Sequence, residues 1–374
     1  MKGEKTTAYL KNLLSEKQIP YLDVLVKKGH TELFRRYDSL DGKANGKEQL
    51  FFFSCTKPLT VACAMRLVEE GKLSLDDEVE NYLPAYGDVF LYNGQGEKVP
   101  PNTKMTVRHL FTMSAGLTYD IWTPETLALK AQMEGAADTV AYASCFAKRP
   151  LSFQPGERFQ YSLCHDVLAA VVEAASGKRF ADYMQEVIFA PLGMKDTGFH
   201  TEKKVQMAPL YVAKEDGSIV ETECVNNLVF GDNYDSGGAG AIGTVEDYAK
   251  FGETLACGGV AENGYRMLKK ETVQEIRTET FASLNVNNRF TCVQGADYGY
   301  GLGVRTRVKP TEWGLPNGEF GWDGAAGLYL MVDPVHEISV VIGMHVMAWP
   351  IVFRNEHLRL VQCVYEDMQA EGLL

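Results

Sequence analysis

The sequence predicts an α+β protein in which a sheet built from both ends of the chain carries a mostly helical insertion. Two observations indicate this class. Apolar and alternating segments typical of strands occur before residue 54 and again after residue 297, whereas residues 75–232 show mainly helical patterns and long loops. We therefore expect residues 1–75 and 233–374 to form a discontinuous sheet domain and residues 76–232 an inserted helical domain.

The first part of the sheet domain is expected to contain a helix, a hairpin and a further strand. The hairpin signal is Lys28-Gly29-His30, because glycine permits a tight turn between two strand-like segments. A short apolar run before residue 54 indicates a buried strand, and apolar residues at helical spacing follow it. The expected elements are a helix over residues 7–17, strands over Tyr21–Lys27, Thr31–Tyr37 and Leu50–Phe53, and a helix from Ser54 to about Gly71.

Glycine, proline and capping residues define the later elements. A helix over residues 164–176 is expected to stop at Gly177, and Thr244, with Asp247 three residues on, is expected to cap another helix. The C-terminal segments then complete the sheet domain. They are expected to be a strand over Tyr298–Val308, strands over residues 327–332 and 338–344 joined by a turn at Asp333-Pro334, and a helix over residues 351–371.

Composition is that of an ordinary globular chain and argues against several classes of function. The 374 residues are 45% hydrophobic, which is ample for a large core, and a formal net charge of −12 without a basic cluster argues against a nucleic-acid partner. No apolar stretch approaches the length of a membrane span, and the polar start Met1–Thr6 does not resemble a signal peptide. We therefore expect a cytoplasmic protein, with a processed secreted form left open.

Neither the cysteines nor the histidines indicate a metal site. The eight cysteines are scattered without a C-x-x-C pair and mostly have apolar neighbours, so reduced thiols in a core are expected. The seven histidines fall in no metal-binding spacing, and only His165 is kept as a weaker candidate because a tyrosine motif lies beside it. No metal and no cofactor are therefore predicted.

The segment Ser54-Cys55-Thr56-Lys57 is the strongest candidate for a catalytic motif. Residues three apart share a face of a helix, so the Ser54 hydroxyl and the Lys57 amine would lie together. A serine hydroxyl is a weak nucleophile by itself, and a buried, uncharged lysine can take its proton. The competing interpretation is a helix-capping serine with a solvated lysine. The apolar run Leu50–Phe53 before the motif favours burial and hence the nucleophile.

A second candidate is Tyr161, which precedes the helix expected over residues 164–176. A tyrosine at a loop–helix junction can present its hydroxyl to a cleft, and a nearby lysine cation would lower its pKa and suit it to acid–base work. A packed structural tyrosine is the alternative for this residue taken alone. The segment Gly238–Gly243 fits G-x-G-x-x-G by letter but follows no strand, so a tight turn is expected there instead of a dinucleotide site.

Taken in order, these pieces resemble the serine β-lactamase and penicillin-binding-protein superfamily, most closely the branch of class C β-lactamases, DD-peptidases and related carboxylesterases. The resemblance rests on the S-x-x-K motif, the tripeptide Tyr161-Ser162-Leu163 and a glycine-rich strand start near the C-terminus. Further matching segments are Leu67–Asp77, Met105–Leu117, Ala190–Thr197 and Ser236-Gly237-Gly238. It covers roughly residues 15–370. The implied fold is β-lactamase/transpeptidase-like, an antiparallel sheet flanked by helices with a mostly helical inserted domain. The resemblance also implies that the active site lies in the cleft between the two domains.

The resemblance also implies a reaction. Ser54 would attack a carbonyl and form an acyl-enzyme, Lys57 and Tyr161 would carry the proton, and water would release the acyl group. Backbone N–H groups of Ser54 and Ala325 would form the oxyanion hole. Glycine at position 324 would let a substrate backbone approach the strand closely. The residues expected to bind substrate are Leu163, Trp322, Asp323 and Gly324.

Two departures from the family pattern bear on the substrate. Trp322 stands where lactamases and peptidases carry a cation that binds a substrate carboxylate, and it looks like the W-x-G of carboxylesterase and acyltransferase members. Leu163 replaces the asparagine that usually ends the second motif, and losing such a hydrogen bond costs about 1.5–3 kcal/mol. Asp323 either turns away from the cleft or pairs with a substrate cation, and Arg158 or Arg305 could restore a carboxylate site.

The sequence thus predicts a serine hydrolase, an esterase or amidase that acts on small acyl substrates without an obligatory carboxylate. A β-lactamase or D-amino-acid peptidase is the alternative within the family, and an acyltransferase would differ only in the acceptor that replaces water. A catalytically inactive, penicillin-binding-like binding protein is the alternative of another class, suggested by the changes at Leu163 and Trp322. The presence of Ser54, Lys57 and Tyr161 together argues against it.

Overall fold

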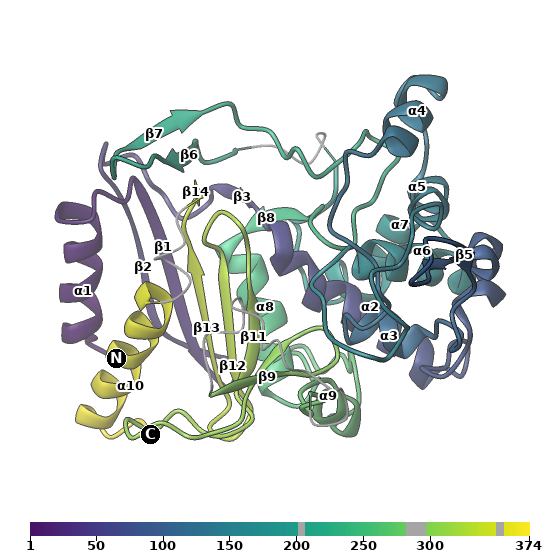
Figure 1. Cartoon of the computed structure of the whole chain (residues 1–374). Helices are drawn as coiled ribbons and strands as arrows, with labels where there is room; N and C mark the ends of the chain where they lie inside the picture. The colour runs from purple at the N-terminus through teal and green to yellow at the C-terminus, as the bar shows by residue number, and fades with distance from the viewer. Residues whose placement is uncertain (201–205, 282–296, 349–354) are drawn as a thin grey trace.

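A seven-stranded antiparallel sheet lies at the centre of the computed structural model, which describes residues 1–200, 206–281, 297–348 and 355–374 (Figure 1). Its order is β2-β1-β13-β12-β11-β10-β9, so β1 from the start of the chain pairs with β13 from its end. This pairing confirms a sheet completed by both ends. The strands are β1 (Tyr21–Lys28), β2 (Thr31–Ser39), β9 (Tyr298–Tyr300), β10 (Arg305–Arg307), β11 (Phe320–Asp323), β12 (Tyr329–Asp333) and β13 (Ile338–Gly343).

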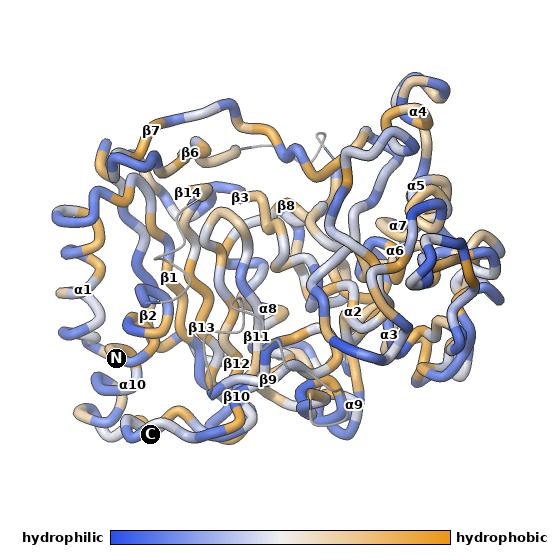
Figure 2. The backbone as a smooth tube through the Cα atoms, viewed as in Figure 1, coloured by the Kyte–Doolittle hydropathy of each residue, from blue (hydrophilic) through white to orange (hydrophobic). Residues whose placement is uncertain are grey.

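Helices cover both faces of this sheet. α1 (Glu4–Ser15) and α10 (His357–Ala370) pack on one face, and α8 (Val245–Ala256) packs on the other (Figure 1). Successive side chains of a strand point to opposite faces, so Val24 of β1 joins the cluster with α1 and α10 while Leu25 joins the cluster with α8. Hydrophobic and hydrophilic residues alternate along α1, as expected of a helix with one buried side (Figure 2).

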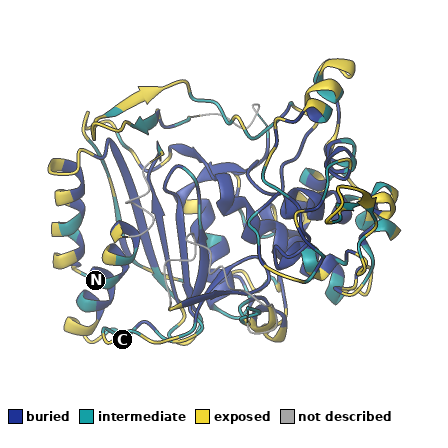
Figure 3. Ribbon diagram, in the orientation of Figure 1, coloured by how far each residue is buried: buried dark blue, intermediate teal, exposed yellow. Residues whose placement is uncertain are grey.

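The two strands at the middle of the sheet are covered on both faces. Every residue of β12 and β13 is buried, and Figure 3 shows the central strands buried along their length. Strands covered on both sides read as continuous apolar runs, which explains why these two were recognisable in the sequence. These buried strands therefore support β11, the neighbour of β12, and the side chains that β11 carries.

Most of the remaining helices form a second body beside the sheet (Figure 1). Its central helix α6 is buried at every position from Cys164 to Val172, as expected of a helix with neighbours all round. Gly177, at φ 70°, ends α6 as predicted, because glycine adopts this left-handed conformation without strain. The helices are α2 (Thr56–Glu69), α3 (Val107–Phe111), α4 (Pro124–Gln132), α5 (Thr139–Phe146), α6 (Cys164–Ser176) and α7 (Phe180–Met184), and α9 (Lys270–Ile276) lies nearer the sheet.

Short strands form three smaller sheets among the described residues. β3 (Gln49–Phe51) pairs with β8 (Ile242–Thr244), and β4 (Leu91–Tyr92) pairs with β5 (Lys98–Val99). A hairpin of β6 (Leu210–Ala213) and β7 (Ile219–Thr222) pairs with β14 (Val346–Met347), although it precedes residue 232. The division into residues 1–75 with 233–374 and residues 76–232 stays a proposal, and this hairpin argues for an earlier second boundary.

Three predicted elements differ from the structure. The strand expected over Leu50–Phe53 is β3, which ends at Phe51 and belongs to the small β3–β8 sheet, not to the central one. The segment Tyr298–Val308 is two strands, β9 and β10, because Gly303 at φ 76° turns the chain between them. The last helix begins at His357, and the expected start at residue 351 lies outside the described residues.

Two expectations from composition can be compared with the described residues. Within them, no helix is both long and apolar enough to cross a membrane. Seven of the eight cysteines are described, and each of the seven is a free thiol. Cys292 lies outside the described part of the chain.

Candidate active site

Ser54 lies on a tight turn between β3 and α2. The turn is a 3₁₀ segment, Phe53–Cys55, and Phe53 before the serine has the left-handed φ of 45°. A non-glycine residue in this conformation is strained, and such strain is typical of functional turns. The buried side chains of Phe52 and Phe53 hold the turn in place, and Ser54 is left 9% exposed.

Lys57 and Tyr161 both reach the Ser54 hydroxyl. The Lys57 amine, on the first turn of α2, donates to Ser54 Oγ at 3.2 Å and to the carbonyl of Gly238 at 2.7 Å. The Tyr161 hydroxyl, from the segment before α6, donates to Ser54 Oγ at 2.7 Å. Lys57 has no exposed surface, so the solvated lysine of the competing interpretation is excluded. The three predicted catalytic residues are therefore brought together from two distant segments.

Aromatic rings enclose the tyrosine on both sides. Tyr161 stacks on Tyr119, with ring centroids 5.3 Å apart and planes at 8°, and on Trp322, with centroids 5.7 Å apart and planes at 23°. The Lys57 amine lies 4.7 Å from the centroid of the Tyr161 ring and 5.6 Å from that of Tyr119. Such contacts fix the orientation of the Tyr161 ring and contribute beyond simple burial.

Burial changes what Tyr161 can do. It raises the pKa of Tyr161 well above its usual value, an effect larger than that of the hydrogen bonds with Ser54 and Trp322, which lower it. The lowered pKa expected from a nearby lysine is therefore wrong. A phenol that holds its proton is suited to donate to Ser54 Oγ and, in a reaction, to a leaving group.

Tyr119 was not identified from the sequence. Its hydroxyl also interacts with Ser54, an interaction that lowers its pKa, although burial raises that pKa by more. The one signal that could have found it is its position two residues after the segment Met105–Leu117, which was recognised by resemblance. A single tyrosine among eighteen has no pattern of its own.

The glycine turn behind Lys57 is a structural part of the site. A Cβ atom at Gly237 would lie 2.4 Å from the carbonyl oxygen of His165, and one at Gly238 would lie 2.4 Å from Asp166 Oδ2. Glycine is required at both positions because the turn approaches α6 so closely. Asp166 Oδ1 accepts hydrogen bonds from Tyr234 at 2.7 Å and Ser236 at 2.6 Å, and this network was also missed in the sequence.

The turn after β11 approaches the Ser54 segment from the other side. Gly324 N–H donates to Leu328 at 2.7 Å and Gly327 N–H donates to Gly324 at 2.8 Å, which places Ala325 at the tip of the turn. A Cβ atom at Gly324 would lie 2.3 Å from the carbonyl oxygen of Phe52. Glycine is therefore needed here for contact with the Ser54 turn, a reason different from the substrate approach expected at this position.

Asp323 points away from Ser54. Trp322 belongs to the core cluster that contains α8, so its strand neighbour Asp323 faces the α10 side. There its carboxylate pairs with Arg305 at 3.3 Å and lies 3.9 Å from His357 Nδ1. Arg305 has no exposed surface and also pairs with Glu319 at 3.3 Å. This geometry contradicts Asp323 as a substrate ligand and Arg305 as a carboxylate-binding cation.

Two further residues named from the sequence, Leu163 and Arg158, make contacts away from Ser54. Leu163 is buried at the start of α6, its N–H donates to Thr118, and it lines a small pocket with Phe146 and Arg149. Arg158 is half-exposed and packs over the ring of Phe153. Neither contact places the side chain on Ser54.

His165 has no role in metal binding that the structure supports. It is fully buried, and burial together with the nearby Lys57 lowers its pKa to about 3, so the ring is neutral. Within the described residues, no group of three or more histidine, cysteine or acidic side chains is arranged to hold a metal ion. The lysine–tyrosine–serine arrangement needs no metal for proton transfer.

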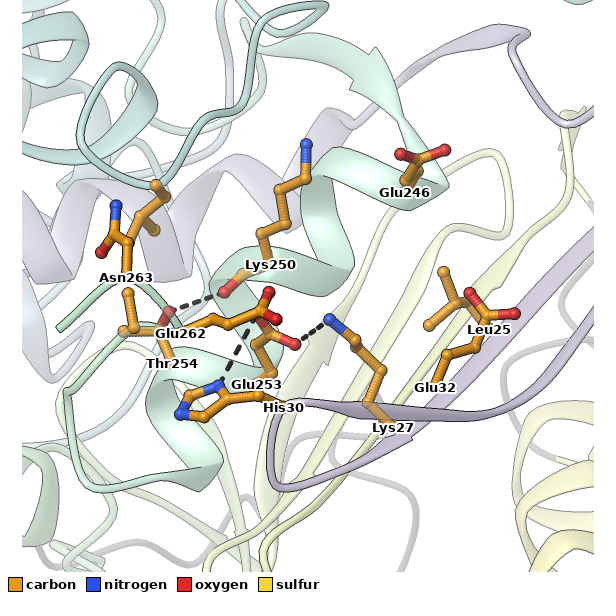
Figure 4. A pocket seen from close by; sticks show the side chains of 12 residues that line it. Leu25, Lys27, His30, Glu32, Glu246, Lys250, Glu253, Thr254, Glu262 and Asn263 are labelled. Carbon is orange, nitrogen blue, oxygen red and sulfur yellow. Dashed lines mark hydrogen bonds and ion pairs between the residues drawn. The ribbon is translucent and has the colours of Figure 1, made fainter. Parts of the chain in front are cut away.

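A separate pocket lies between the β1–β2 hairpin and α8 (Figure 4). It has a volume of about 410 Å³ and contains an ion pair between Lys27 and Glu253, with His30 Nδ1 3.8 Å from the same carboxylate. None of the residues predicted for catalysis or substrate binding lines it. It is therefore distinct from the Ser54 site.

The fold and the Ser54–Lys57–Tyr161 arrangement define a class of protein with an S-x-x-K serine on a turn beside an antiparallel sheet. The chain belongs to the family described as Beta-lactamase, whose profile matches residues 7–362. It is 28% identical over 360 residues to esterase EstB of Burkholderia gladioli, covering 88% of this chain and 86% of the esterase.

Solved structures show the same β-lactamase/transpeptidase-like fold. EstCE1, described as a hydrolase with promiscuous acyltransferase activity, aligns with a TM-score of 0.77 at 23% identity, covering 97% of both chains. The simvastatin synthase LovD from Aspergillus terreus aligns with a TM-score of 0.78 at 20% identity, covering 97% of this chain and 98% of that one. These likenesses confirm the predicted fold class over nearly the whole chain.

Proposed function

We propose that the protein is a serine hydrolase that forms an acyl-enzyme at Ser54 on small ester or amide substrates. The observation that carries the proposal is the hydrogen-bonded contact of Ser54 Oγ with both the Lys57 amine and the Tyr161 hydroxyl. A nucleophile needs a base within hydrogen-bond reach and a further group that orients it, and both are present in this arrangement. Membership of the Beta-lactamase family and the similarity to an esterase support hydrolysis.

The proton path follows from these distances. Lys57, uncharged for this step, takes the Ser54 hydroxyl proton as Oγ bonds to the substrate carbonyl carbon. The N–H groups of Ser54 and Ala325 hold the oxyanion. When the bond to the leaving alcohol or amine breaks, Tyr161 gives that group its proton and regains one from Lys57. Water then adds to the acyl carbon by the reverse path, releasing the acid and restoring the serine.

The walls of the site favour a neutral substrate. Tyr119, Tyr161 and Trp322 form an aromatic stack beside Ser54, in which Trp322 is buried. Arg305 of β10 is fully buried behind the sheet, and the Lys57 amine is hydrogen-bonded to Ser54 and Gly238. A substrate carboxylate would thus find no cation supplied by these residues, and burying it unpaired is costly. We therefore place esters without a carboxylate ahead of β-lactams and peptides.

Steady-state hydrolysis tests this ranking. We expect the wild type to hydrolyse p-nitrophenyl butyrate with a kcat/KM at least about tenfold above that for a chromogenic cephalosporin. Ser54→Ala should abolish both activities. Ser339→Ala is the matched control, because Ser339 is a buried serine of β13 in the part of the sheet that does not contact Ser54.

The alternatives have distinct outcomes in the same assay. Cephalosporin turnover equal to or above ester turnover would favour a β-lactamase or peptidase. Product esters formed on addition of an alcohol would indicate acyl transfer. A folded wild type with no turnover beyond that of Ser54→Ala would contradict the proposal and favour a binding protein.

A further inference from the structure

The end of β11 is held by the sheet on one side only. On the β12 side, pairing continues through Trp322 opposite Leu330 and Asp323 opposite Tyr329. On the β10 side, pairing stops at Gly321 opposite Arg305. The last two residues of the strand therefore have no backbone ladder toward β10. These two residues are Trp322, which stacks on Tyr161, and Asp323, which leads into the turn that contains Ala325.

The side chain of Arg305 spans this gap behind the sheet. Its Nη2 donates to the Leu330 carbonyl of β12 at 2.9 Å, and its Nη1 donates to Asp323 Oδ1 at 3.3 Å. The guanidinium can cross β11 because residue 321 is glycine. A Cβ atom at Gly321 would lie 1.9 Å from the Leu330 oxygen and 3.3 Å from Arg305 Nη2. One buried side chain thus ties β10 to both β11 and β12.

We propose that Asp323 and Arg305 are positioning residues for the reaction at Ser54. Their buried ion pair replaces the missing β10 ladder and keeps Trp322 and Ala325 in the register that acyl transfer requires. This inference rests on the proposed function, because Ala325 matters only if an oxyanion forms beside it. Oxyanion donors act only within a narrow range of distance. A small shift of the strand end should therefore lower kcat strongly and change substrate binding little.

The pair is also expected to respond to pH. Burial raises the pKa of Asp323 to about 6. The positive charge of Arg305 lowers this pKa, and the negative charge of Glu319 raises it. The ion pair therefore exists above about pH 6 and is lost as the pH falls through that value. The other groups near Asp323 or Arg305 are Tyr298 of β9, Tyr329 of β12, His357 of α10, Cys55 of the Ser54 turn and Tyr248 of α8. His357 is neutral, since burial lowers its pKa to about 3.

The test compares Asp323→Asn with Glu319→Gln. Both carboxylates lie 3.3 Å from Arg305 and both are largely or wholly buried, but only Asp323 is on the strand end. For Asp323→Asn we expect kcat for p-nitrophenyl butyrate at pH 8 to fall by about tenfold or more with KM within about threefold. The acid limb near pH 6 should disappear in this variant. Glu319→Gln should keep both kcat and that limb.

A second measurement does not depend on turnover. Hydrogen–deuterium exchange of the peptide containing Trp322 and Ala325 should be faster in Asp323→Asn than in wild type at pH 8, and unchanged in Glu319→Gln. Wild-type kcat and an unchanged acid limb in Asp323→Asn would overturn the proposal, and so would equal exchange. Loss of activity in Glu319→Gln to the same degree would show a general effect on folding instead. If the wild type has no esterase activity, the proposed function fails, and the exchange experiment still decides whether the pair holds the strand.

Discussion

At the scale of single residues, the protons on the side chains around Ser54 determine which group can act as base and which as acid. Ser54 Oγ accepts from a tyrosine that burial keeps protonated and from a lysine with no exposed surface. In the proposed mechanism the amine is therefore the base, and the phenol is the acid that serves the leaving group. The stacked rings on either side of Tyr161 hold its hydroxyl at this position.

Removing the Tyr161 hydroxyl should therefore affect the rate and not binding. Tyr161→Phe keeps the stacked ring but loses the proton donor, so kcat for p-nitrophenyl butyrate should fall by about 10²–10⁴ with KM changed less than about fivefold. Steady-state kinetics measure both constants. A kcat within a factor of about two of wild type would remove Tyr161 from the proton path.

Tyr119 should have a smaller effect of the same kind. Its hydroxyl interacts with Ser54, but Lys57 and Tyr161 remain when it is removed. We expect Tyr119→Phe to lower kcat by at most about tenfold, the upper end for the loss of one neutral polar contact. Tyr37→Phe is a suitable control because Tyr37 is 44% exposed on β2. Equal activities of the two variants would limit Tyr119 to packing.

The sequence predicts some of these residues and not others for physical reasons. Ser54 and Lys57 are three apart on one turn, so local geometry alone predicts their contact. Lys57 donates to the Gly238 carbonyl, and the Gly238 N–H donates to Asp166 of α6. These contacts depend on the packing of distant segments, which no local sequence pattern indicates. The orientation of Asp323 followed from strand alternation, but only once the strand and its faces were defined.

Close approach between two turns is the feature that matters at the scale of elements. The turn after β11 meets the Ser54 turn where Gly324 faces the Phe52 carbonyl. The thiol of Cys55 adds contacts to the carbonyls of Trp322 at 3.5 Å and Leu328 at 3.3 Å. The Ser54 turn and the Ala325 turn are thus packed together as one unit.

Adding a methyl group at Gly324 should disturb this unit. The Cβ of Gly324→Ala would lie 2.3 Å from the Phe52 oxygen, so the two turns must separate. We expect the free energy of unfolding to fall by about 1–3 kcal/mol and acylation to slow. Urea denaturation measures the first effect. The control is Gly94→Ala, where a Cβ meets nothing within 4 Å. Equal stability of the two variants would contradict the close contact.

The strands of the sheet were predicted better than the segments around them. β12 and β13 are buried on both faces and read as apolar runs, and the β1–β2 hairpin has a glycine at φ 56° in its turn. β3 carries the same apolar pattern yet pairs with β8 in another sheet. An apolar run indicates a buried strand, but the partner of that strand depends on packing between distant segments.

Buried histidines set the response to acid at the scale of the whole molecule. Burial lowers the pKa of His109 and His345 to about 4 and that of His165 and His357 to about 3. Each is neutral in the folded protein and binds a proton in the unfolded chain below about pH 6.5. Their contributions to stability are therefore full above pH 6.5 and are lost as the pH falls toward their folded values.

Two buried aspartates act in the opposite direction. Burial raises the pKa of Asp23 to about 7 and that of Asp323 to about 6, so their contributions are full below about pH 4 and are lost as the pH rises through those values. Burial raises the pKa of Glu173 and Glu253 by a smaller amount, and these two groups add to the effect of the aspartates. The four histidines outweigh these carboxylates, and the free energy of unfolding should rise between pH 5 and 6.5.

Urea denaturation across this range measures the balance. His165→Phe should reduce the mean slope by about 1 kcal/mol per pH unit, because His165 is buried and neither ring nitrogen has a hydrogen bond within the described residues. An unchanged slope would show that His165 does not titrate on unfolding.

The most direct test of the central claim is the mass of the intact protein after brief incubation with a fluorophosphonate or p-nitrophenyl butyrate. Nucleophilic attack by Ser54 predicts the addition of one phosphonyl or butyryl group, mapped to the peptide that contains Ser54. The addition should be absent in Ser54→Ala and present in Ser339→Ala. An unmodified wild-type protein, or a label that persists in Ser54→Ala, would contradict the account.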